Sequence, residues 1–364
     1  MGPDEPHALP LGATGRDASG DLLRGERAVN RCSLHWASSI ESAASSRAAD
    51  RCNYPHEYVF AEKTDTEREV RSRPVAGNRW PGAESVSSIR CMSSADLARD
   101  PLPLLGRTAL VTGVSRRQGI GYAIARRLAA YGASVFLHHY RPHDLDQPWG
   151  GDDLDAVHAG VAEQLVPEAR IAETGLDLAE PEAPQQLVDA VVAEFGHLDV
   201  LVCNHARSGG DGELGELDAA MLDGHWAVNT RSSILLAQAF AAQHDGRPGG
   251  RIVFMTSGQQ QGPMPGEVAY AAAKGALAEI TTTLSDQLAD AGITTNTVNP
   301  GPVDTGYLDE ATWRTIRPMF PYGRYGEPDD PARLIAWLAT DEARWITGQV
   351  LNTEGGFGRW RPRA

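Results

Sequence analysis

From about Leu102 onward, two kinds of hydrophobic pattern alternate along the chain. Short runs rich in Val, Leu and Ile, typical of buried strands, are followed by Ala-rich segments whose apolar positions recur at helical spacing. The run TALVTG predicts a first strand over 108–113, and GIGYAIARRLAAY predicts a helix over 119–131. Six more strands are predicted at 133–140, 171–176, 198–204, 251–257, 294–301 and 349–356, and four more helices at 184–195, 219–243, 267–291 and 331–339.

Strands that alternate with helices indicate repeated βα units and a parallel sheet. Joined by right-handed crossovers, the elements predict an α/β fold. We expect a single Rossmann-type, doubly wound, seven-stranded parallel sheet over residues 102–364, with helices on both faces.

One segment of this region, 302–326, is rich in Pro, Tyr and Arg and is predicted to be irregular. We expect it to form a lid over the substrate, since its aromatic and apolar side chains would suit an apolar pocket. The residues available for that lining are Trp313, Met319, Phe320 and Tyr322. A structural flap or a subunit contact is the alternative interpretation.

The first quarter of the chain has a different character. From Met1 to Arg90, charged and turn-forming residues are scattered among short apolar pieces, and no segment keeps a helical or strand period for long. We therefore expect residues 1–101 to be a disordered leader. Met92 stands shortly before the first strand, so one hypothesis is that translation starts there; the other is that the leader is an interaction tail.

The formal net charge is −15, while residues 1–90 hold 13 acidic and 12 basic residues, so the negative charge belongs to the folded part. An acidic domain argues against binding to nucleic acid or to an anionic membrane. No apolar run approaches the ~20 residues that span a bilayer. The opening residues lack the pattern of a secretory signal, so we expect a soluble, cytoplasmic protein.

The four cysteines have no spacing that would suggest zinc or a redox dithiol, so we interpret them as ordinary thiols. Cys32, Cys52 and Cys91 fall in the irregular leader, and Cys203 falls in a predicted strand, where we expect it to be part of the core. No metal site is expected.

A glycine-rich turn, TGVSRRQGIG, lies between the first predicted strand and the first predicted helix, with Gly113, Gly119 and Gly121. A dinucleotide pyrophosphate needs backbone N–H groups at close range and a helix N-terminus facing its charge, and glycines remove the Cβ atoms that would block the approach. A plain tight turn is the alternative, but the strand and helix around it favour a dinucleotide site.

Tyr270 and Lys274, in the sequence YAAAK, stand four residues apart at the start of a long predicted helix. This spacing puts both side chains on one face. An ammonium group beside a phenol favours the phenolate, which would make Tyr270 a usable proton donor or acceptor. An ordinary surface pair is the alternative. However, Lys63 and Lys274 are the only lysines in a chain that otherwise uses arginine, so a high lysine content does not explain a lysine at this position.

Two further polar residues lie where chemistry is expected. Ser257 closes the predicted strand at 251–257, where strand ends converge at the carboxyl edge of a parallel sheet, and its hydroxyl could bind a substrate carbonyl. A helix cap or turn serine is the alternative. Asn229 lies in the middle of the predicted helix 219–243, where asparagine is unfavourable, which suggests a bend or a bound water.

In order along the chain, these features resemble the short-chain dehydrogenase/reductase family over about 102–356. Besides the residues above, the chain carries LDL with Asp177, an Asn-X-Ala turn at 204–206, NPGPVDT at 299–305, and RWITGQVLNTEGG, which resembles the closing strand of the family. The pattern is most similar to that of 3-oxoacyl-[acyl-carrier-protein] reductases.

The resemblance implies an oxidoreductase that interconverts a ketone and a secondary alcohol with a nicotinamide cofactor, in the manner of 3-oxoacyl-thioester reductases. Tyr270 would pass the proton and Ser257 would hold the carbonyl oxygen. Lys274 would lower the phenol pKa and bind the ribose, and Asn229 would anchor a proton-relay water. The cofactor supplies the hydride and the protein supplies position.

The resemblance also implies a set of cofactor contacts. Asp177 would meet the adenine, Asn204 and Ala206 would line the ribose side, and Thr305 would hold the nicotinamide carboxamide. The full expected set is Gly113, Ser115, Arg116, Gly119, Ile120, Gly121, Arg141, Asp177, Asn204, Ala206, Tyr270, Lys274, Pro300, Gly301, Val303 and Thr305.

The sequence departs from the family pattern at two places. Five residues separate Gly113 from Gly119 where the common pattern has three. That length is more like the divergent enoyl reductases, which place the Tyr and Lys further apart. His205 replaces the usual second Asn and Arg207 the usual Gly, so the turn beneath the cofactor is altered.

The choice of cofactor depends on the end of the second predicted strand, where NAD enzymes usually carry an acid for the ribose 2′-hydroxyl. Here the strand ends in His138-His139-Tyr140-Arg141, with no carboxylate. Arginines at 116, 117 and 141 would pair with a 2′-phosphate, so NADP(H) is expected. Asp144 and Asp146 follow closely and would favour NAD(H) instead.

A different class of function is a cofactor-sensing regulatory or scaffold protein that has lost turnover, and the intact set of Asn229, Ser257, Tyr270 and Lys274 argues against it. The expected partner is a small carbonyl or alcohol substrate. By resemblance, the chain is also expected to form a homodimer or homotetramer through the helices predicted at 219–243 and 267–291.

Overall fold

The computed structural model describes residues 97–358. The expectations for the leader up to residue 96, including Met92 and the first three cysteines, lie outside the described residues and stay predictions. None of the helices in the described part has the length and hydrophobicity that crossing a membrane requires.

Seven parallel strands form one sheet in the order β3-β2-β1-β4-β5-β6-β7, which confirms the predicted fold class. The strands are β1 (Thr108–Thr112), β2 (Ser134–His139), β3 (Ile171–Gly175), β4 (Val200–Cys203), β5 (Gly250–Met255), β6 (Ile293–Asn299) and β7 (Val350–Asn352). Because β1 pairs with both β2 and β4, the winding of the chain reverses beside β1. A crevice for a ligand is expected at the carboxyl ends of the strands at such a point.

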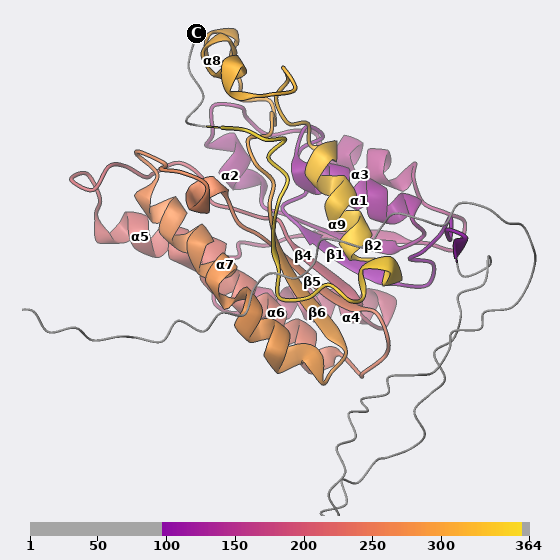
Figure 1. The fold of residues 1–364 in the computed structure, drawn as a ribbon. Helices are drawn as coiled ribbons and strands as arrows, with labels where there is room; N and C mark the ends of the chain where they lie inside the picture. Colours follow the sequence, from indigo (N-terminus) through magenta and orange to yellow (C-terminus); the bar gives the residue numbers. More distant parts are fainter. Residues whose placement is uncertain (1–96, 359–364) are drawn as a thin grey trace, which may run out of the picture. The chain divides into compact units, whose positions relative to one another are not determined.

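Helices cover both faces of the sheet (Figure 1). On one face lie α1 (Ile120–Ala130), α3 (Leu154–Ala162) and α9 (Asp329–Leu338), and on the other lie α4 (Ala183–Phe195), α6 (Ser232–Gln243) and α7 (Val268–Ala289). Successive strand residues point to opposite faces, so Ala109 and Val111 join the first core while Leu110 joins the second. Cys203 is buried in the second core, as expected.

Three helices were missed by the hydrophobic pattern. They are α2 (Arg141–Leu145), α3 and α8 (Glu310–Ile316), the last of which lies in the segment expected to be irregular. Two of them begin with an aspartate cap: Asp153 accepts from the N–H of Asp155, and Asp309 accepts from the N–H of Thr312. The cap, rather than a long apolar period, is the local signal that starts such short helices.

The helix predicted over 219–243 is interrupted. It consists of α5 (Ala219–His225), a π-helical segment at Trp226–Arg231, and α6. A π-helical turn holds an extra residue and re-aims the side chains that follow. Asn229, whose place in the middle of a predicted helix suggested a bend or a bound water, lies in this π-helical segment.

At the amino-terminal edge of the sheet, two arginines converge on one carboxylate. Asp341 accepts from Arg107 at 2.7 Å and from Arg251 at 2.9 Å, and the side chain of Arg251 is only 3% exposed. Partial burial opposes the ionisation of Asp341, but its hydrogen bond and charge contacts with the arginines lower its pKa below the ordinary value. Asp341 therefore keeps a buried guanidinium paired.

We predict that Asp341→Asn lowers the free energy of unfolding by about 1–2 kcal/mol at pH 7, because Arg251 loses a charge-assisted bond. The lowered pKa means that the wild-type chain has this stabilisation above the unfolded-state pKa, near 4, and loses it as the pH falls through the folded-state value. Urea unfolding at pH 7 and pH 3 measures both effects.

The matched control for this prediction is Asp245→Asn. Asp245 pairs with Arg247 at 2.6 Å, but both side chains are largely in solvent, so its removal should change stability little. Equal effects of the two substitutions at pH 7 would contradict a special role for the buried guanidinium.

Candidate active site

A cavity of about 610 Å³ opens at the carboxyl ends of β1, β2 and β4, where the winding of the sheet reverses. Its floor is the glycine turn after β1. Gly113 has φ of 73°, and a Cβ built on it would lie 2.8 Å from the Cα of His205. A Cβ on Gly121 would lie 2.4 Å from the carbonyl oxygen of Gly113. Only glycine fits either position, so the turn keeps its backbone close to the cavity.

The N-terminus of α1 faces this cavity. Gly119 is the N-cap residue, no described side chain caps the helix, and its first turn holds no acidic residue. Gly119 and Ile120 both line the cavity. Uncapped amides at the positive end of a helix suit an anionic group, so the residues present fit the pyrophosphate of a dinucleotide.

Most of the expected cofactor-binding residues meet at this cavity. Those that line it are Gly113, Ser115, Arg116, Gly119, Ile120, Asp177, Asn204, Ala206 and Thr305. The expected residues that do not line it are Gly121, Arg141, Tyr270, Lys274, Pro300, Gly301 and Val303. Gly121 and Val303 are buried instead.

The arginines expected to receive a 2′-phosphate lie in different places. Arg116 lines the cavity, with its guanidinium 5.4 Å from the ring centroid of Trp149 and hydrogen-bonded to the carbonyl of Thr305. Burial lowers the pKa of Arg116, and Asp144 opposes that shift. Arg117 is exposed and paired with Asp152, and Arg141 is exposed at the start of α2. Of the three, only Arg116 is at the cavity wall.

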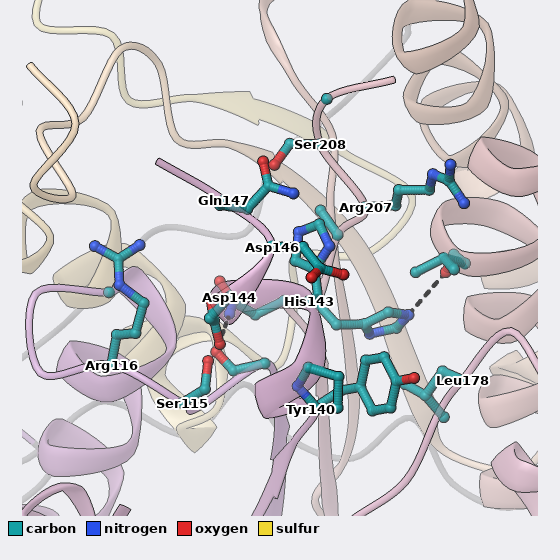
Figure 2. Close-up of a pocket in the computed structure, with 18 of the residues that line it drawn as sticks. Ser115, Arg116, Tyr140, His143, Asp144, Asp146, Gln147, Leu178, Arg207 and Ser208 are labelled. Carbon is teal, nitrogen blue, oxygen red and sulfur yellow. Dashed lines mark hydrogen bonds between the residues drawn. The ribbon is translucent and has the colours of Figure 1, made fainter. Parts of the chain in front are cut away.

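One wall of the cavity was not anticipated as a whole. It comes from the segment after β2, which contributes Tyr140, His143, Asp144, Asp146, Gln147 and Trp149. Figure 2 shows Arg116 and Arg207 on opposite sides of the cavity, with the segment that holds Asp144 and Asp146 between them. The sequence signal for this wall is the position of the segment directly after β2, because the carboxyl end of that strand borders the crevice.

His205 shows how the altered turn beneath the cavity is held. Its Nδ1 accepts from the hydroxyl of Thr112 at 2.7 Å, and its Nε2 donates to the carbonyl of Val228 at 3.0 Å. The ring therefore joins β1 to the π-helical segment. Burial lowers the pKa of His205 well below 6.5, and burial lowers that of the neighbouring His138 to about 4, so both rings are neutral at physiological pH.

Three of the four expected catalytic side chains lie together. Ser257 follows β5, while Tyr270 and Lys274 lie on successive turns of α7. The Nζ of Lys274 is 5.9 Å from the Tyr270 ring centroid and donates to the carbonyl of Met255 at 3.0 Å. The hydroxyl of Ser257 lies 4.0 Å from the sulfur of Met264, and its interaction with the phenol lowers the pKa of Tyr270.

Burial dominates the electrostatics of this group, and the expected effect of Lys274 on the phenol pKa stays a prediction. Burial raises the pKa of Tyr270 above its ordinary value, Glu267 and Tyr307 raise it further, and only the hydrogen bond with Ser257 lowers it. Burial also lowers the pKa of Lys274 to about 8. Burial thus sets the direction of both pKa shifts, and the phenol is protonated at neutral pH, as a phenol of ordinary pKa also is.

Asn229, the fourth expected catalytic residue, is buried in the π-helical segment. Its Oδ1 accepts from the N–H of Arg207 at 2.7 Å, and its Nδ2 donates to the carbonyl of Arg207 at 3.1 Å. The amide thus pairs with the backbone of the loop after β4. Its expected role as a water anchor stays a prediction.

In the segment expected to form a lid, aromatic rings pack against one another, while Phe320 also contacts Phe357 at 4.7 Å and Tyr307 contacts Trp149 of the cavity wall at 6.2 Å. The ring of Phe320 lies 4.9 Å from that of Tyr325 and 5.9 Å from that of Trp313, and Met319 is buried. Tyr322 is 81% exposed and makes no such contact. From this segment, Thr305 reaches the cavity described above.

Comparison with known proteins agrees with this geometry. A family model described as enoyl-(acyl carrier protein) reductase matches residues 113–358. YjdA, an uncharacterized oxidoreductase of Bacillus subtilis, is 42% identical over 255 residues, which cover 70% of this chain and 97% of the relative. Cyclohexanol dehydrogenase of Rhodococcus sp. is 32% identical over 278 residues, which cover 71% of this chain and 98% of the relative.

Solved structures share the fold. A short-chain dehydrogenase from Burkholderia cenocepacia, solved in complex with NADP, matches with a TM-score of 0.62 and 37% identity. The match covers 70% of this chain and 98% of that one. The sequence and fold similarities therefore extend over nearly the whole length of these proteins.

We predict that Gly121→Ala weakens NADPH binding at least about tenfold and lowers the unfolding free energy by about 1–3 kcal/mol, because the new Cβ must displace the backbone of the glycine turn. Nicotinamide fluorescence and urea unfolding measure the two effects. Gly275→Ala is the control: it lies within α7, and its Cβ would meet nothing nearer than 3.9 Å. Unchanged NADPH binding in Gly121→Ala would contradict the close-approach argument.

Proposed function

The chain belongs to the short-chain dehydrogenase/reductase family, and on that premise we propose that it interconverts ketones and secondary alcohols with NADP(H). It is an oxidoreductase of carbonyl and alcohol groups. The Bacillus relative is named an oxidoreductase and the Rhodococcus relative a cyclohexanol dehydrogenase. The observation that carries the proposal is the meeting of Ser257, Tyr270 and Lys274 at the carboxyl edge of the sheet, next to a cavity with a dinucleotide-type glycine turn.

Each side chain has a distinct role in the proposed reaction. The hydroxyl of Ser257 holds the substrate oxygen, and the phenol of Tyr270 delivers a proton to that oxygen during reduction. The phenol carries the proton to be delivered at neutral pH. Lys274 holds positive charge beside the ring and stabilises the phenolate that proton transfer leaves. When bound, the nicotinamide supplies the hydride.

Three observations support NADP(H) as the cofactor. β2 ends without a carboxylate, at His139 and Tyr140, and the guanidinium of Arg116 lies at the cavity wall. The Burkholderia relative was solved with NADP. Asp144 and Asp146 also line the cavity, and they are the residues that would favour the 2′-hydroxyl of NAD(H).

The substrate class that we propose is a 3-oxoacyl thioester or a related ketone, because the sequence motifs most resemble the 3-oxoacyl reductases. The Rhodococcus relative is named for cyclohexanol. A screen should therefore contain an acetoacetyl thioester and cyclohexanone. Turnover of one and not the other assigns the class.

The exposed apolar residues Leu222 and Trp226, at α5 and the π-helical segment, support the proposed homodimer or homotetramer. They lie along the predicted pairing region, whose other element is α7. Burying such side chains in a subunit interface removes apolar surface from water.

We predict that Arg116→Gln weakens NADPH binding about tenfold and changes NADH binding less than about twofold, because only NADPH carries the phosphate that the guanidinium would pair with. Fluorescence titration of both cofactors measures this. Arg117→Gln is the matched control, since Arg117 is exposed and pairs with Asp152. Tighter wild-type binding of NADH than of NADPH would sink the cofactor proposal and leave the rest standing.

We predict that Tyr270→Phe lowers kcat about 10²–10⁴-fold and leaves the Kd for NADPH nearly unchanged, since the variant loses the proton donor and keeps the cavity. Steady-state rates with the ketones above and nicotinamide fluorescence measure the two quantities. A wild-type chain that binds NADPH and turns over no carbonyl substrate would support a cofactor-sensing protein instead.

A further inference from the structure

The loop between β4 and α5 touches both the cavity and the helix that carries Tyr270. Arg207, Ser208, Gly209 and Gly210 line the cavity. The next residue, Asp211, turns toward the N-terminus of α7, 58 residues later in the chain. One short segment thus contacts the proposed cofactor site and the proposed catalytic helix.

The carboxylate of Asp211 holds the first turn of α7. Its Oδ1 accepts from the N–H of Ala269 at 3.0 Å, and its Oδ2 accepts from the N–H of Tyr270 at 2.7 Å. Its Oδ1 also accepts from the N–H of Gly212 at 2.8 Å, which fixes the carboxylate in its own loop. The backbone amide of the proposed proton donor is therefore one of the groups that this side chain binds.

His225 contacts the side chain of Tyr270, whereas Asp211 binds its backbone. Its ring is buried and packs edge-to-face against the Tyr270 ring, with centroids 6.0 Å apart and an interplanar angle of 87°. Its Nε2 donates to the carbonyl of Gly209 at 3.1 Å, and its Nδ1 accepts from Asn229 at 3.3 Å. His225, which packs against Tyr270, is thus hydrogen-bonded to the same loop that contains Asp211.

We propose that Asp211 is a positioning residue for carbonyl reduction: its carboxylate fixes the backbone of Tyr270, with His225 packed against the ring, and so places the phenol beside Ser257. This inference rests on the proposed function, in which Tyr270 transfers the proton. Asp211 does not touch the reacting atoms and acts through Tyr270.

The charge of Asp211 matters as well as its hydrogen bonds. Burial opposes its ionisation, but backbone hydrogen bonds from Tyr270, Ala269 and Gly212 lower its pKa, so it is anionic at neutral pH. It offsets the positive end of α7, which would otherwise favour the phenolate. Removing the charge should therefore lower the pKa of the phenol.

Other groups also face the phenol. Glu267 and Tyr307 raise the pKa of Tyr270, and the hydrogen bond with Ser257 lowers it. Lys274 lies beside the ring on α7, and His225 packs against it from α5. None of these groups is replaced in Asp211→Asn, so a shift of the pH curve in that variant reports on the charge of Asp211.

Two substitutions separate position from charge. Asp211→Asn keeps one acceptor oxygen, which can serve Tyr270 or the pair Ala269 and Gly212, and removes the charge, whereas Asp211→Ala removes the charge and both acceptors. We expect Asp211→Ala to lower kcat about tenfold or more, with KM changed less than about twofold, because the phenol is displaced. We expect Asp211→Asn to keep kcat within about threefold and to shift the rise of alcohol oxidation with pH by about half a unit toward lower pH.

Asp153→Ala is the matched control. Asp153 caps α3 by accepting from the N–H of Asp155 at 3.1 Å, so its loss removes an aspartate cap from a helix on the other face of the sheet from α7. It should match the wild-type chain in kcat and in pH dependence. NADPH titration of each variant shows that it is folded, and if Asp211→Ala does not fold, the pH curve of Asp211→Asn decides.

The outcomes are distinct. Wild-type kcat and pH dependence in both Asp211 variants would overturn the inference, as would an Asp211→Asn variant as slow as Asp211→Ala with no displacement of the pH curve. Undiminished turnover in Tyr270→Phe would overturn the proposed function and this inference together. Activity that is lost in Tyr270→Phe and insensitive to Asp211 would overturn the positioning role alone.

Discussion

The close approach of two backbone segments at the glycine turn is the constraint on which the rest of the site depends. Gly113 and Gly121 leave no room for a Cβ, so the end of β1, the start of α1 and the turn at His205 meet in contact. Because all seven strands are parallel, their carboxyl ends share one edge. The same edge then holds the uncapped N-terminus of α1, the loop after β4 and the segment with Ser257.

Burial determines the chemistry available at this edge. It raises the pKa of Tyr270 and lowers that of Lys274 to about 8, which is the opposite of a simple ion pair. At neutral pH the phenol is protonated, and Lys274, with a pKa of about 8, is still mostly charged. Both states suit delivery of a proton to a substrate oxygen. The neutral His138 and His205 contribute structure instead, since their nitrogens hold strands and turns.

Much of the fold could be predicted from the sequence, because the hydrophobic pattern of the buried strands and the long helices is clear. The glycine turn, and the pair Tyr270 and Lys274, could be found because their chemistry depends on local spacing. The short helices α2, α3 and α8 could not be found by period, since caps such as Asp309 rather than apolar stripes start two of them.

Other features depend on contacts between distant residues. The π-helical segment places Asn229 against the backbone of Arg207, and Asp211 caps a helix 58 residues away. The pKa of Tyr270 could not be derived from its lysine neighbour, because burial depends on how the whole chain packs. Local spacing singled out Asn229 and Tyr270, but it could not show which distant residues contact them.

Carbonyl reduction at this site requires that hydride pass from NADPH to the carbonyl carbon. This transfer is measured by supplying NADPH with both C4 hydrogens of the nicotinamide replaced by deuterium, together with cyclohexanone or an acetoacetyl thioester, and following the label by mass spectrometry. We expect a secondary alcohol that carries one deuterium. Bound NADPH that transfers no label to any ketone offered would contradict this expectation.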